Sequence, residues 1–396
     1  MKKFLVISVP AAVLALAALL VGVEVWTRLT WNPLNGTPGV FLSDPVRIQR
    51  LAPGYSGWFA GVPVKINRLE LRDDREYDLV KGPTTFRILV LGDSVTFGHG
   101  SLNEHTYPYL LEQQLRAWRP EVDWQVWNAA VPGYNTSQEL AHLLEVGPTF
   151  RPDLVVVGFF ENDVVDNFPV ALPSWTRRVT SGMLSVLYRH IYSTQLYKRI
   201  YLQLAWRISA SNSYRLRLEH LSTERLLLAN VAQVQRPEGQ QLTRFDRLTD
   251  EESAVTMCPE GQRLGDDVVA SMQREAGWGS WVAAVRRFQQ LNREGTYPIV
   301  FFVNFVPLAC RNPDVFYDGG SANVNRFFLR MLGDGTPTVS VYDEFRHLRP
   351  SQMPLAAEHA IGNSNLVKAN VLFKYLRDEV LPHLTGPSTP RSLQAY

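Results

Sequence analysis

From residue 86 onward, continuous apolar runs alternate with segments in which apolar residues recur at helical spacing. The apolar runs predict buried strands, and the periodic segments predict the helices that connect them. The predicted strands are 86–91, 122–129, 153–160, 297–305 and 338–345. The predicted helices are 107–118, 137–146, 280–291 and 365–380. Apolar strands that alternate with helices are typical of a parallel sheet covered on both faces, which predicts the α/β class.

The first residues carry a different pattern. Lys2 and Lys3 precede an uncharged run from Phe4 to Val23, and its length of about 20 residues is enough to cross a bilayer as a helix. The run continues without a convincing cleavage site, so we predict an uncleaved anchor; a cleaved signal peptide is the alternative. The two lysines place the N-terminus in the cytoplasm. The expected location is the bacterial inner membrane, single-pass, with the rest of the chain on the periplasmic side.

Two further segments differ from the α/β pattern. Residues 29–85 are rich in Pro, Gly and Trp and contain short alternating runs, which predict β-hairpins or an extended arm leading away from the membrane. More than a hundred residues separate the third predicted strand from the fourth, too many for one crossover connection. We therefore expect a helical, basic insertion or cap at 171–279. The last residues, 385–396, are predicted to form a disordered tail.

The insertion begins with an unusual distribution of charge. There is no Asp or Glu from Asn167 to Leu218, whereas this stretch is rich in Arg and Lys. Apolar and tyrosine side chains fall near helical spacing within it: Leu184, Leu187, Tyr188, Ile191, Tyr192, Leu196, Tyr197, Ile200, Tyr201 and Leu204. One interpretation is a basic amphipathic helix that lies on anionic lipid or binds an anionic glycan. The other, which we favour at this stage because aromatic stripes are usually core, is a helix packed on the main domain.

Composition and charge reduce the number of function classes that fit the chain. The formal net charge of +2 gives no basic excess, which argues against a dedicated nucleic-acid binder. Hydrophobic residues make up 45% and charged residues 20%, as expected for a chain that buries a large core. Cys258 and Cys310 are the only cysteines, and they either form one disulfide or remain as free buried thiols.

The first strand of the α/β segment ends in a Gly-Asp-Ser sequence that places Ser94 after the strand. Three glycine-containing motifs with a similar position are excluded. No Lys-Ser/Thr pair follows, so the segment is not a P-loop, and Gly98-x-Gly100 lacks the third glycine of a dinucleotide fingerprint. Thr96 stands where the nucleophile elbow of α/β-hydrolases requires glycine. The remaining question is whether Ser94 is a nucleophile or a turn residue.

Other polar residues follow the next strands. Because ligands bind at the carboxyl ends of parallel strands, these positions are candidates for one site. Gly133 follows the second strand in Asn-Ala-Ala-Val-Pro-Gly, Asn162 follows the third in an Asn-Asp pair, and His359 precedes the last helix. Together with Ser94, these segments in this order resemble the sequence blocks of the SGNH (GDSL-type) hydrolase family.

The resemblance covers most of residues 86–166 and 280–384. It implies a flavodoxin-like three-layer α/β/α sandwich with a parallel five-stranded sheet, the SGNH hydrolase fold, plus a helical insertion. The hydrolase domain would then have two parts, 86–170 and 280–384, behind an anchor or signal segment at 1–28. It implies no metal and no organic cofactor.

The resemblance also implies roles for individual residues. Ser94 takes the position of the nucleophile, and His359 that of the base. Gly133 and Asn162 take the positions of the oxyanion-hole donors, which suits a backbone N–H without a side chain in the way and a neutral amide.

The segment around His359 departs from the family pattern. The family usually has Asp three residues before the histidine, and this chain has Ala356 there. Without the acid, the imidazole lacks its usual orienting partner. A backbone carbonyl, Asp343 or Glu344 could orient the ring instead. The substitution predicts a slow enzyme.

The sequence thus predicts a membrane-anchored serine esterase that hydrolyses acyl or acetyl esters of an envelope glycan or lipid. The predicted partners are this small ester or acylated substrate and the membrane, which the chain contacts through the N-terminal helix and, in the amphipathic interpretation above, through the basic insertion. One alternative is an O-acetyltransferase of the same fold that modifies exopolysaccharide. The other is a non-catalytic binding or assembly protein on the same scaffold.

Overall fold

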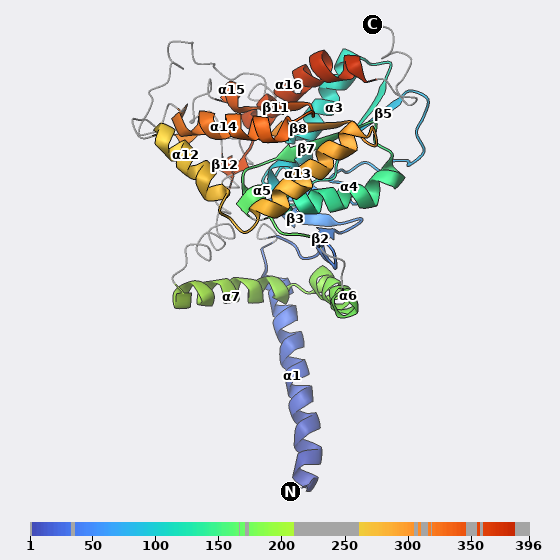
Figure 1. Cartoon of the computed structure of the whole chain (residues 1–396). Coiled ribbons are helices and arrows are strands. Elements are labelled where there is room, and N and C mark those ends of the chain that lie inside the picture. The colour runs from blue at the N-terminus through green and yellow to red at the C-terminus, as the bar shows by residue number, and fades with distance from the viewer. Residues whose placement is uncertain are drawn as a thin grey trace.

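Figure 1 shows the layout of the computed structural model. The described residues are 2–32, 36–165, 167–170, 174–209, 261–304, 308–309, 316–317, 319–345, 355–356 and 359–384. Helix α1 (Lys2–Thr30) projects away from an α/β domain, and helices α6 (Trp175–His190) and α7 (Ser193–Ser209) lie across the end of α1 nearest that domain. Outside the described residues lie Cys258, Cys310 and the predicted tail 385–396.

A five-stranded sheet forms the centre of the α/β domain. Its strands are β5 (Thr85–Gly92), β6 (Asp123–Asn128), β7 (Leu154–Phe159), β8 (Ile299–Val303) and β11 (Thr338–Ser340). They lie in the order β11-β8-β7-β5-β6, and every neighbouring pair is parallel. This is the doubly wound order of flavodoxin-like sheets, which changes direction between β5 and β7. The fold predicted from the sequence is confirmed.

The helices cover both faces of the sheet, giving three layers. One face packs on α3 (Tyr107–Trp118) and α16 (Asn363–Tyr375). The other packs on α4 (Thr136–Phe150), α13 (Trp278–Arg293) and α14 (Gly319–Leu332). Because both faces are covered, every residue of β5, β7 and β8 is buried. This explains why these strands are continuous apolar runs in the sequence.

The second half of the predicted strand 338–345 is helical, so that part of the prediction is wrong. Strand β11 has only three residues, and α15 (Tyr342–Phe345) follows it. The Ser340 hydroxyl accepts a hydrogen bond of 3.1 Å from the backbone N–H of Tyr342, which satisfies an N–H group at the start of that helical turn. Tyr342 and Phe345 are buried, so the apolar residues of this segment belong to a buried helical turn and not to a strand.

The arm between α1 and the sheet consists of two antiparallel hairpins, β1–β2 (Phe41–Asp44, Ile48–Leu51) and β3–β4 (Ser56–Phe59, Val62–Lys65). The hairpins pack on the α/β domain. They share a hydrophobic cluster with the loops that follow β5 and β6: Leu51, Val62, Val64, Ile66, Phe97, Ala130, Val131 and Tyr134. The arm is therefore a wall of the α/β domain at the carboxyl edge of the sheet.

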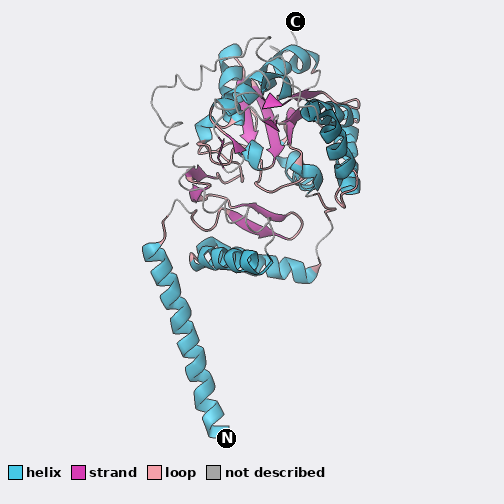
Figure 2. Cartoon of the chain, turned by 90° about the vertical axis from the view of Figure 1, so that its left-hand side faces the viewer, coloured by secondary structure: helices cyan, strands magenta, loops and turns pink. Residues whose placement is uncertain are grey.

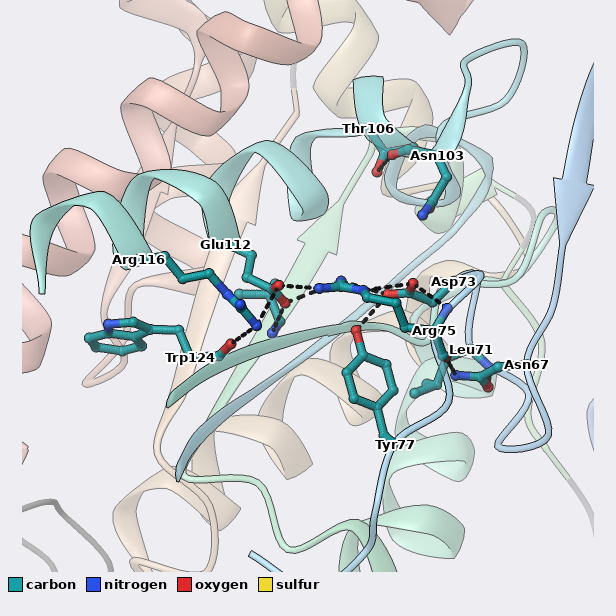
Figure 3. A network of polar contacts seen from close by, with 11 residues as sticks. Asn67, Leu71, Asp73, Arg75, Tyr77, Asn103, Thr106, Glu112, Arg116 and Trp124 are labelled. Carbon is teal, nitrogen blue, oxygen red and sulfur yellow. Dashed lines mark hydrogen bonds and ion pairs between the residues drawn. The ribbon is translucent and has the colours of Figure 1, made fainter. Parts of the chain in front are cut away.

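A polar network fastens the end of the arm to the domain (Figure 3). Arg75 forms ion pairs with Asp73 and with the fully buried Glu112 of α3. The Tyr77 hydroxyl donates to Asp73, and Glu112 accepts a 2.9 Å hydrogen bond from the backbone N–H of Val126 in β6. Burial alone would raise the pKa of the Asp73 carboxyl, but hydrogen bonds from Arg75 and Tyr77 hold that pKa below its ordinary value. The network joins arm, helix and strand through charged groups that are all paired.

The remaining described elements are short or belong to the insertion. They are α2 (Ser94–Phe97), a 3-10 turn (Asn103–His105), α5 (Asn162–Val165), α12 (Gly261–Met272), β9 (Leu308–Ala309), β10 (Phe316–Tyr317), β12 (Leu355–Ala356), β13 (His359–Ala360), a π-turn (Leu376–Val380) and a 3-10 turn (Leu381–His383). Helix α6 packs on β1 through Ser181 and Ser185. Leu184, Leu187 and Leu204 of the predicted stripe are nevertheless exposed, so the interpretation of the stripe as core is wrong at these positions.

His142 of α4 makes stability dependent on pH. Its ring is buried against Tyr134, and burial lowers its pKa to about 3, with nearby Arg47 lowering it further and Asp44 opposing. The unfolded chain binds a proton near pH 6.5, whereas the folded chain does not. Stability is therefore complete above pH 6.5 and is lost as the pH falls toward 3, by up to about 4 kcal/mol.

We expect His142→Gln to reduce this loss of stability at acidic pH (the acid limb of the stability curve). The measurement is the midpoint of thermal unfolding between pH 4 and pH 7. The exposed His383 provides the matched control, and His383→Gln should leave the pH dependence unchanged. An H142Q protein with the same acid limb as the unsubstituted chain would contradict the assignment.

Candidate active site

The turn after β5 presents Ser94 at the carboxyl edge of the sheet. Gly92 ends the strand with a φ of +156°, and a Cβ atom there would lie 2.2 Å from Thr96 Oγ1, so only glycine fits. Asp93 caps the short helix α2, and its Oδ1 accepts a hydrogen bond of 2.9 Å from the backbone N–H of Val95. Ser94, the first residue of α2, is half-buried. The Gly-Asp-Ser sequence thus sets the backbone and leaves the serine hydroxyl accessible.

His359 reaches Ser94 from a distant part of the chain. It lies in the hairpin β12–β13, where it pairs with Ala356. Its Nε2 and the Ser94 Oγ are 2.7 Å apart and share a hydrogen bond. His359, the histidine predicted from the sequence, thus lies within hydrogen-bond distance of the serine hydroxyl.

A second histidine lies beside this pair, and sequence analysis missed it. The ring of His99 stacks on that of His359, with centroids 4.4 Å apart and planes 24° apart. Phe59 of the arm packs edge-on against His99 at 5.3 Å. His99 directly follows Gly98, the residue that ends α2. It is not the residue bonded to Ser94, but it covers one face of the His359 ring and so restricts its orientation.

Gly133 lies in the loop after β6. This loop continues the pairing with β5, because the backbone N–H of Val131 donates a 3.0 Å hydrogen bond to the Gly92 carbonyl. Gly133 has a φ of +80°, a left-handed conformation that favours glycine. The arm supports the turn, since Gln49 Nε2 donates a 2.6 Å hydrogen bond to the carbonyl of Pro132. The loop position is thus fixed by both the sheet and the arm.

Asn162 begins helix α5 directly after β7. Strands β6, β5 and β7 are neighbours in the sheet, so Gly133, Ser94 and Asn162 follow three adjacent strands at one edge. The Asn162 side chain also hydrogen-bonds toward the Asp93 carboxyl, where it helps to lower the pKa. The structure therefore brings all four residues predicted from the sequence to the carboxyl edge of the sheet.

Comparison with protein families identifies this arrangement. Residues 90–225, about a third of the chain, match the model of the GDSL-like lipase/acylhydrolase family. Residues 90–225 are thus similar to a GDSL-like acylhydrolase domain, and the edge that holds Ser94 and His359 is called the GDSL site below. The matched range includes Ser94, Gly133 and Asn162 but ends before His359, whose place in the site is given by its hydrogen bond to Ser94.

Solved structures similar to this chain are also hydrolases. An alpha/beta hydrolase enzyme from the metagenome of Lake Arreo, Spain, is 16% identical, with 73% of this chain and 94% of that one covered and a TM-score of 0.33. A catalytic mutant of the acetylxylan esterase Axe2 from Geobacillus stearothermophilus is 11% identical, with 74% and 95% covered and a TM-score of 0.39. The lipase Lip_vut3 from a goat rumen metagenome is 11% identical, with 72% and 95% covered and a TM-score of 0.34. No curated protein matches the chain significantly.

Three ionisable groups lie buried beneath the GDSL serine: Asp93, Glu139 of α4 and Lys368 of α16. Burial raises the pKa of Asp93 to about 6, while the N–H of Val95 and the charge of Lys368 lower it. Burial lowers the pKa of Lys368 to about 8, and Asp93 raises it. Burial raises the pKa of Glu139 well above its ordinary value, and the neighbouring Asp93 raises it further. Burial therefore favours the neutral form of Glu139, whereas Asp93 and Lys368 each favour the charged form of the other.

Asn365 is a structural neighbour of the GDSL site. Its amide nitrogen donates to Ser101 Oγ at 3.0 Å and to the carbonyl of His105 at 2.9 Å, which fixes α16 against the loop after α2. Within the described parts of the chain, no group of three or more His, Cys, Asp or Glu side chains is arranged to hold a metal ion.

Proposed function

We propose that this GDSL domain hydrolyses acyl esters through an acyl-enzyme formed on Ser94. The observation that carries the proposal is the 2.7 Å hydrogen bond between Ser94 Oγ and His359 Nε2, which joins residues 265 positions apart. A serine hydroxyl is a weak nucleophile unless an adjacent base takes its proton. A half-buried serine bonded to an imidazole within an acylhydrolase domain meets this requirement.

In the proposed reaction His359 carries its ring proton on Nδ1, so that Nε2 accepts the Ser94 proton as Oγ bonds to the acyl carbon. The bond from that carbon to the alcohol oxygen then breaks, and the alcohol leaves with the proton from Nε2. Water adds to the acyl carbon next and gives a proton to Nε2. The carboxylic acid departs as Ser94 regains its hydrogen, which returns both residues to their starting state.

The proposed oxyanion donors are the backbone N–H groups of Ser94 and Gly133 and the amide of Asn162. Their support is their position after three neighbouring strands, together with the left-handed backbone of Gly133. One such donor commonly contributes about 10²–10³ in kcat.

His359 lacks the family's aspartate, and we propose that packing takes over part of its role. Ala356 occupies that position, while His99 covers one face of the ring. Stacking restricts the ring orientation, whereas the family's aspartate also stabilises the imidazolium that forms during the reaction. We therefore propose a slower acylhydrolase than one with a complete triad.

The proposed substrate is an acyl or acetyl ester on an envelope glycan or lipid. The support is α1, whose segment Pro10–Thr30 is long and apolar enough to span a membrane and is almost entirely exposed. An anchor of this kind holds the hydrolase next to the bilayer surface. Lys2 and Lys3 before the segment place the domain on the periplasmic side in this proposal.

The test uses the full chain in detergent, a serine-directed fluorophosphonate and p-nitrophenyl acetate. We expect covalent labelling and ester hydrolysis, both abolished by Ser94→Ala. Ser56→Ala, at an exposed serine in β3, is the matched control and should retain both. Absence of labelling and turnover in the unsubstituted chain would overturn catalysis and leave a binding or assembly role. Acylated glycan in place of free acid, when an acetyl donor and glycan are supplied together, would instead indicate an acetyltransferase.

A further inference from the structure

Helix α6 has an apolar face that no part of the described chain covers. Its opposite face is polar and packs on β1, where Ser181 and Ser185 hydrogen-bond to Ser43. At 100° per residue, Thr176 and His190 point away from these serines, but most of the side chains on that face are apolar and exposed. They include Trp175, Val179, Met183 and Val186. The helix therefore turns its polar side to the protein and its apolar side to the surroundings, the reverse of a helix on a soluble domain.

Helix α7 has a similar apolar stripe. Tyr197, Tyr201, Leu204 and Ile208 recur at intervals of three or four residues and are all exposed. Large exposed apolar patches on a protein are interaction surfaces rather than incidental features. Together, α6 and α7 present two such stripes.

The corner between α6 and α7 is fixed to α1. The carboxylate of Glu24 accepts hydrogen bonds from the backbone N–H groups of Tyr192 and Ser193, at 3.0 and 2.8 Å, at the start of α7. Arg28 donates to the carbonyl of His190 at the end of α6, and its guanidinium lies 5.0 Å from the centre of the Tyr192 ring. The two helices therefore meet α1 at a defined height, near Glu24.

That height coincides with the end of the apolar run. The segment from Phe4 to Val23 has about 20 residues, which rise about 30 Å as a helix, the thickness of the hydrocarbon core of a bilayer. If this segment spans the core, Glu24 and the corner bound to it lie at the membrane–water interface. Both views show α6 and α7 crosswise to α1, on the side of the α/β domain from which α1 leaves (Figures 1 and 2).

Charge complements the apolar faces. There is no acidic residue from Asn167 to Leu218, and Arg177, Arg178 and Arg189 of α6 are exposed. At 100° per residue, Arg189 borders the apolar face, whereas Arg177 and Arg178 lie nearer the serine face. An apolar stripe on a helix that also carries exposed arginines is typical of helices that lie in the interface of an anionic membrane. A soluble protein partner would not require the stripes to lie at the level where the anchor leaves the bilayer.

We propose that α6 and α7 form an interfacial platform on the leaflet facing the α/β domain. The apolar side chains enter the acyl-chain boundary, and the arginines contact the phosphates of anionic lipid. This inference rests on the proposed membrane span of α1. The platform prevents the domain from tilting freely about its anchor, so the GDSL site is held at a constant height and orientation above the lipid.

The test places a nitroxide at single sites of the full chain, with both native cysteines replaced by serine, in vesicles of three parts phosphatidylcholine to one part phosphatidylglycerol. Met183→Cys and Leu204→Cys probe the platform. Leu14→Cys in α1, 70% exposed, is the lipid reference, and Val80→Cys in the arm, 78% exposed, is the water reference. Power saturation compares collisions with oxygen, which concentrates in lipid, and with a water-soluble nickel chelate. We expect the platform sites to favour oxygen several-fold over the value at position 80.

The possible outcomes distinguish a failure of the platform proposal from a failure of the proposed membrane span. Water-like collisions at positions 183 and 204 with lipid-like collisions at position 14 would overturn the platform and keep the anchor. Water-like collisions at position 14 as well would overturn the membrane span itself. Spin–spin broadening that grows with protein density would show a second copy on the stripes and also overturn the platform. The oxygen preference at position 183 should fall in vesicles of phosphatidylcholine alone, and an unchanged value would overturn the role given to anionic lipid.

Discussion

Replacing His359 by glutamine is expected to lower kcat/KM for p-nitrophenyl acetate by about 10³-fold. Glutamine retains a polar group near Ser94 Oγ, where Nε2 of His359 now lies at 2.7 Å, but it cannot take up a proton. The hydroxyl then has no base, and the leaving alcohol has no acid. Because both roles belong to the transition state, the loss should lie in kcat, with little change in KM. The rise of rate with pH that reports ionisation of the histidine should disappear.

Two variants make this result specific. His383→Gln changes an exposed histidine in the last described turn and should leave kcat unchanged. His99→Gln removes the ring that stacks on His359, and we expect it to lower kcat about 10-fold by loosening the base rather than removing it. If H359Q stays active while Ser94→Ala is inactive, the base is another group. His99, whose ring centroid lies 4.4 Å from that of His359, would then be the first to examine.

The positions of Ser94, Gly133 and Asn162 could be predicted because a parallel sheet collects the ends of its strands at one edge. In the sequence, the polar residues directly follow the predicted strands. The doubly wound order then places β6, β5 and β7 side by side. His359 was found through its distance from the last helix. Its contact with Ser94 depends on a hairpin between β12 and β13 that no turn motif in the sequence indicates.

His99 could not be placed from the sequence, because its position depends on how α2 ends. Gly98 adopts a left-handed conformation, with a φ of +84°, directly after that four-residue helix. The chain reverses there, and the N–H of His99 donates a 3.0 Å hydrogen bond back to the carbonyl of Ser94. The glycine was a visible signal for a helix end. The direction in which the next side chain points required the three-dimensional turn.

Lys368 was overlooked because a lysine in a helix is usually on the surface. The signal in the sequence was that Lys368 shares one face of α16 with two other polar residues, Ser364 and Asn365. All three are buried. Recognising this face required knowing which side of α16 meets the sheet. The packing of the arm could not be predicted for a similar reason, since its hairpins were visible in the sequence but the loops against which they pack were not.

Arg72, between the arm and the sheet, is expected to be the residue on which the site most depends for its stability. Its side chain is fully buried and donates to the backbone carbonyls of Phe97, Gly98 and Ser101, in the loop that carries His99. Burial lowers the pKa of Arg72 to about 9, so the guanidinium is still charged at pH 7. Removing the guanidinium breaks three buried hydrogen bonds from a charged donor, at roughly 1–3 kcal/mol each. The Gly98 carbonyl then keeps only the N–H of Ser101, and the Phe97 carbonyl only the longer bond from the Asn128 amide.

We expect Arg72→Met to destabilise the chain by about 4 kcal/mol, which lowers the midpoint of thermal unfolding by about 10 °C. The same change should lower kcat about 10-fold at temperatures where the protein is folded, because the freed loop no longer holds His99 against His359. Arg72→Lys should recover less than half of the lost stability, since an ammonium cannot reproduce the planar fork.

The matched control is Arg68→Met in the same segment, whose side chain is 79% exposed and pairs only with Glu76 among the described residues. An exposed pair of this kind contributes at most about 1 kcal/mol, so the control should shift the midpoint by less than about 3 °C. If R72M unfolds like R68M, the loop after α2 is held by its own turn and the arm is a passive covering. If R72M loses stability but keeps its kcat, the arm stabilises the fold without positioning the base. The expected joint loss would show that this GDSL domain uses its N-terminal arm, which lies outside the residues matched by the family model, to hold its catalytic loop.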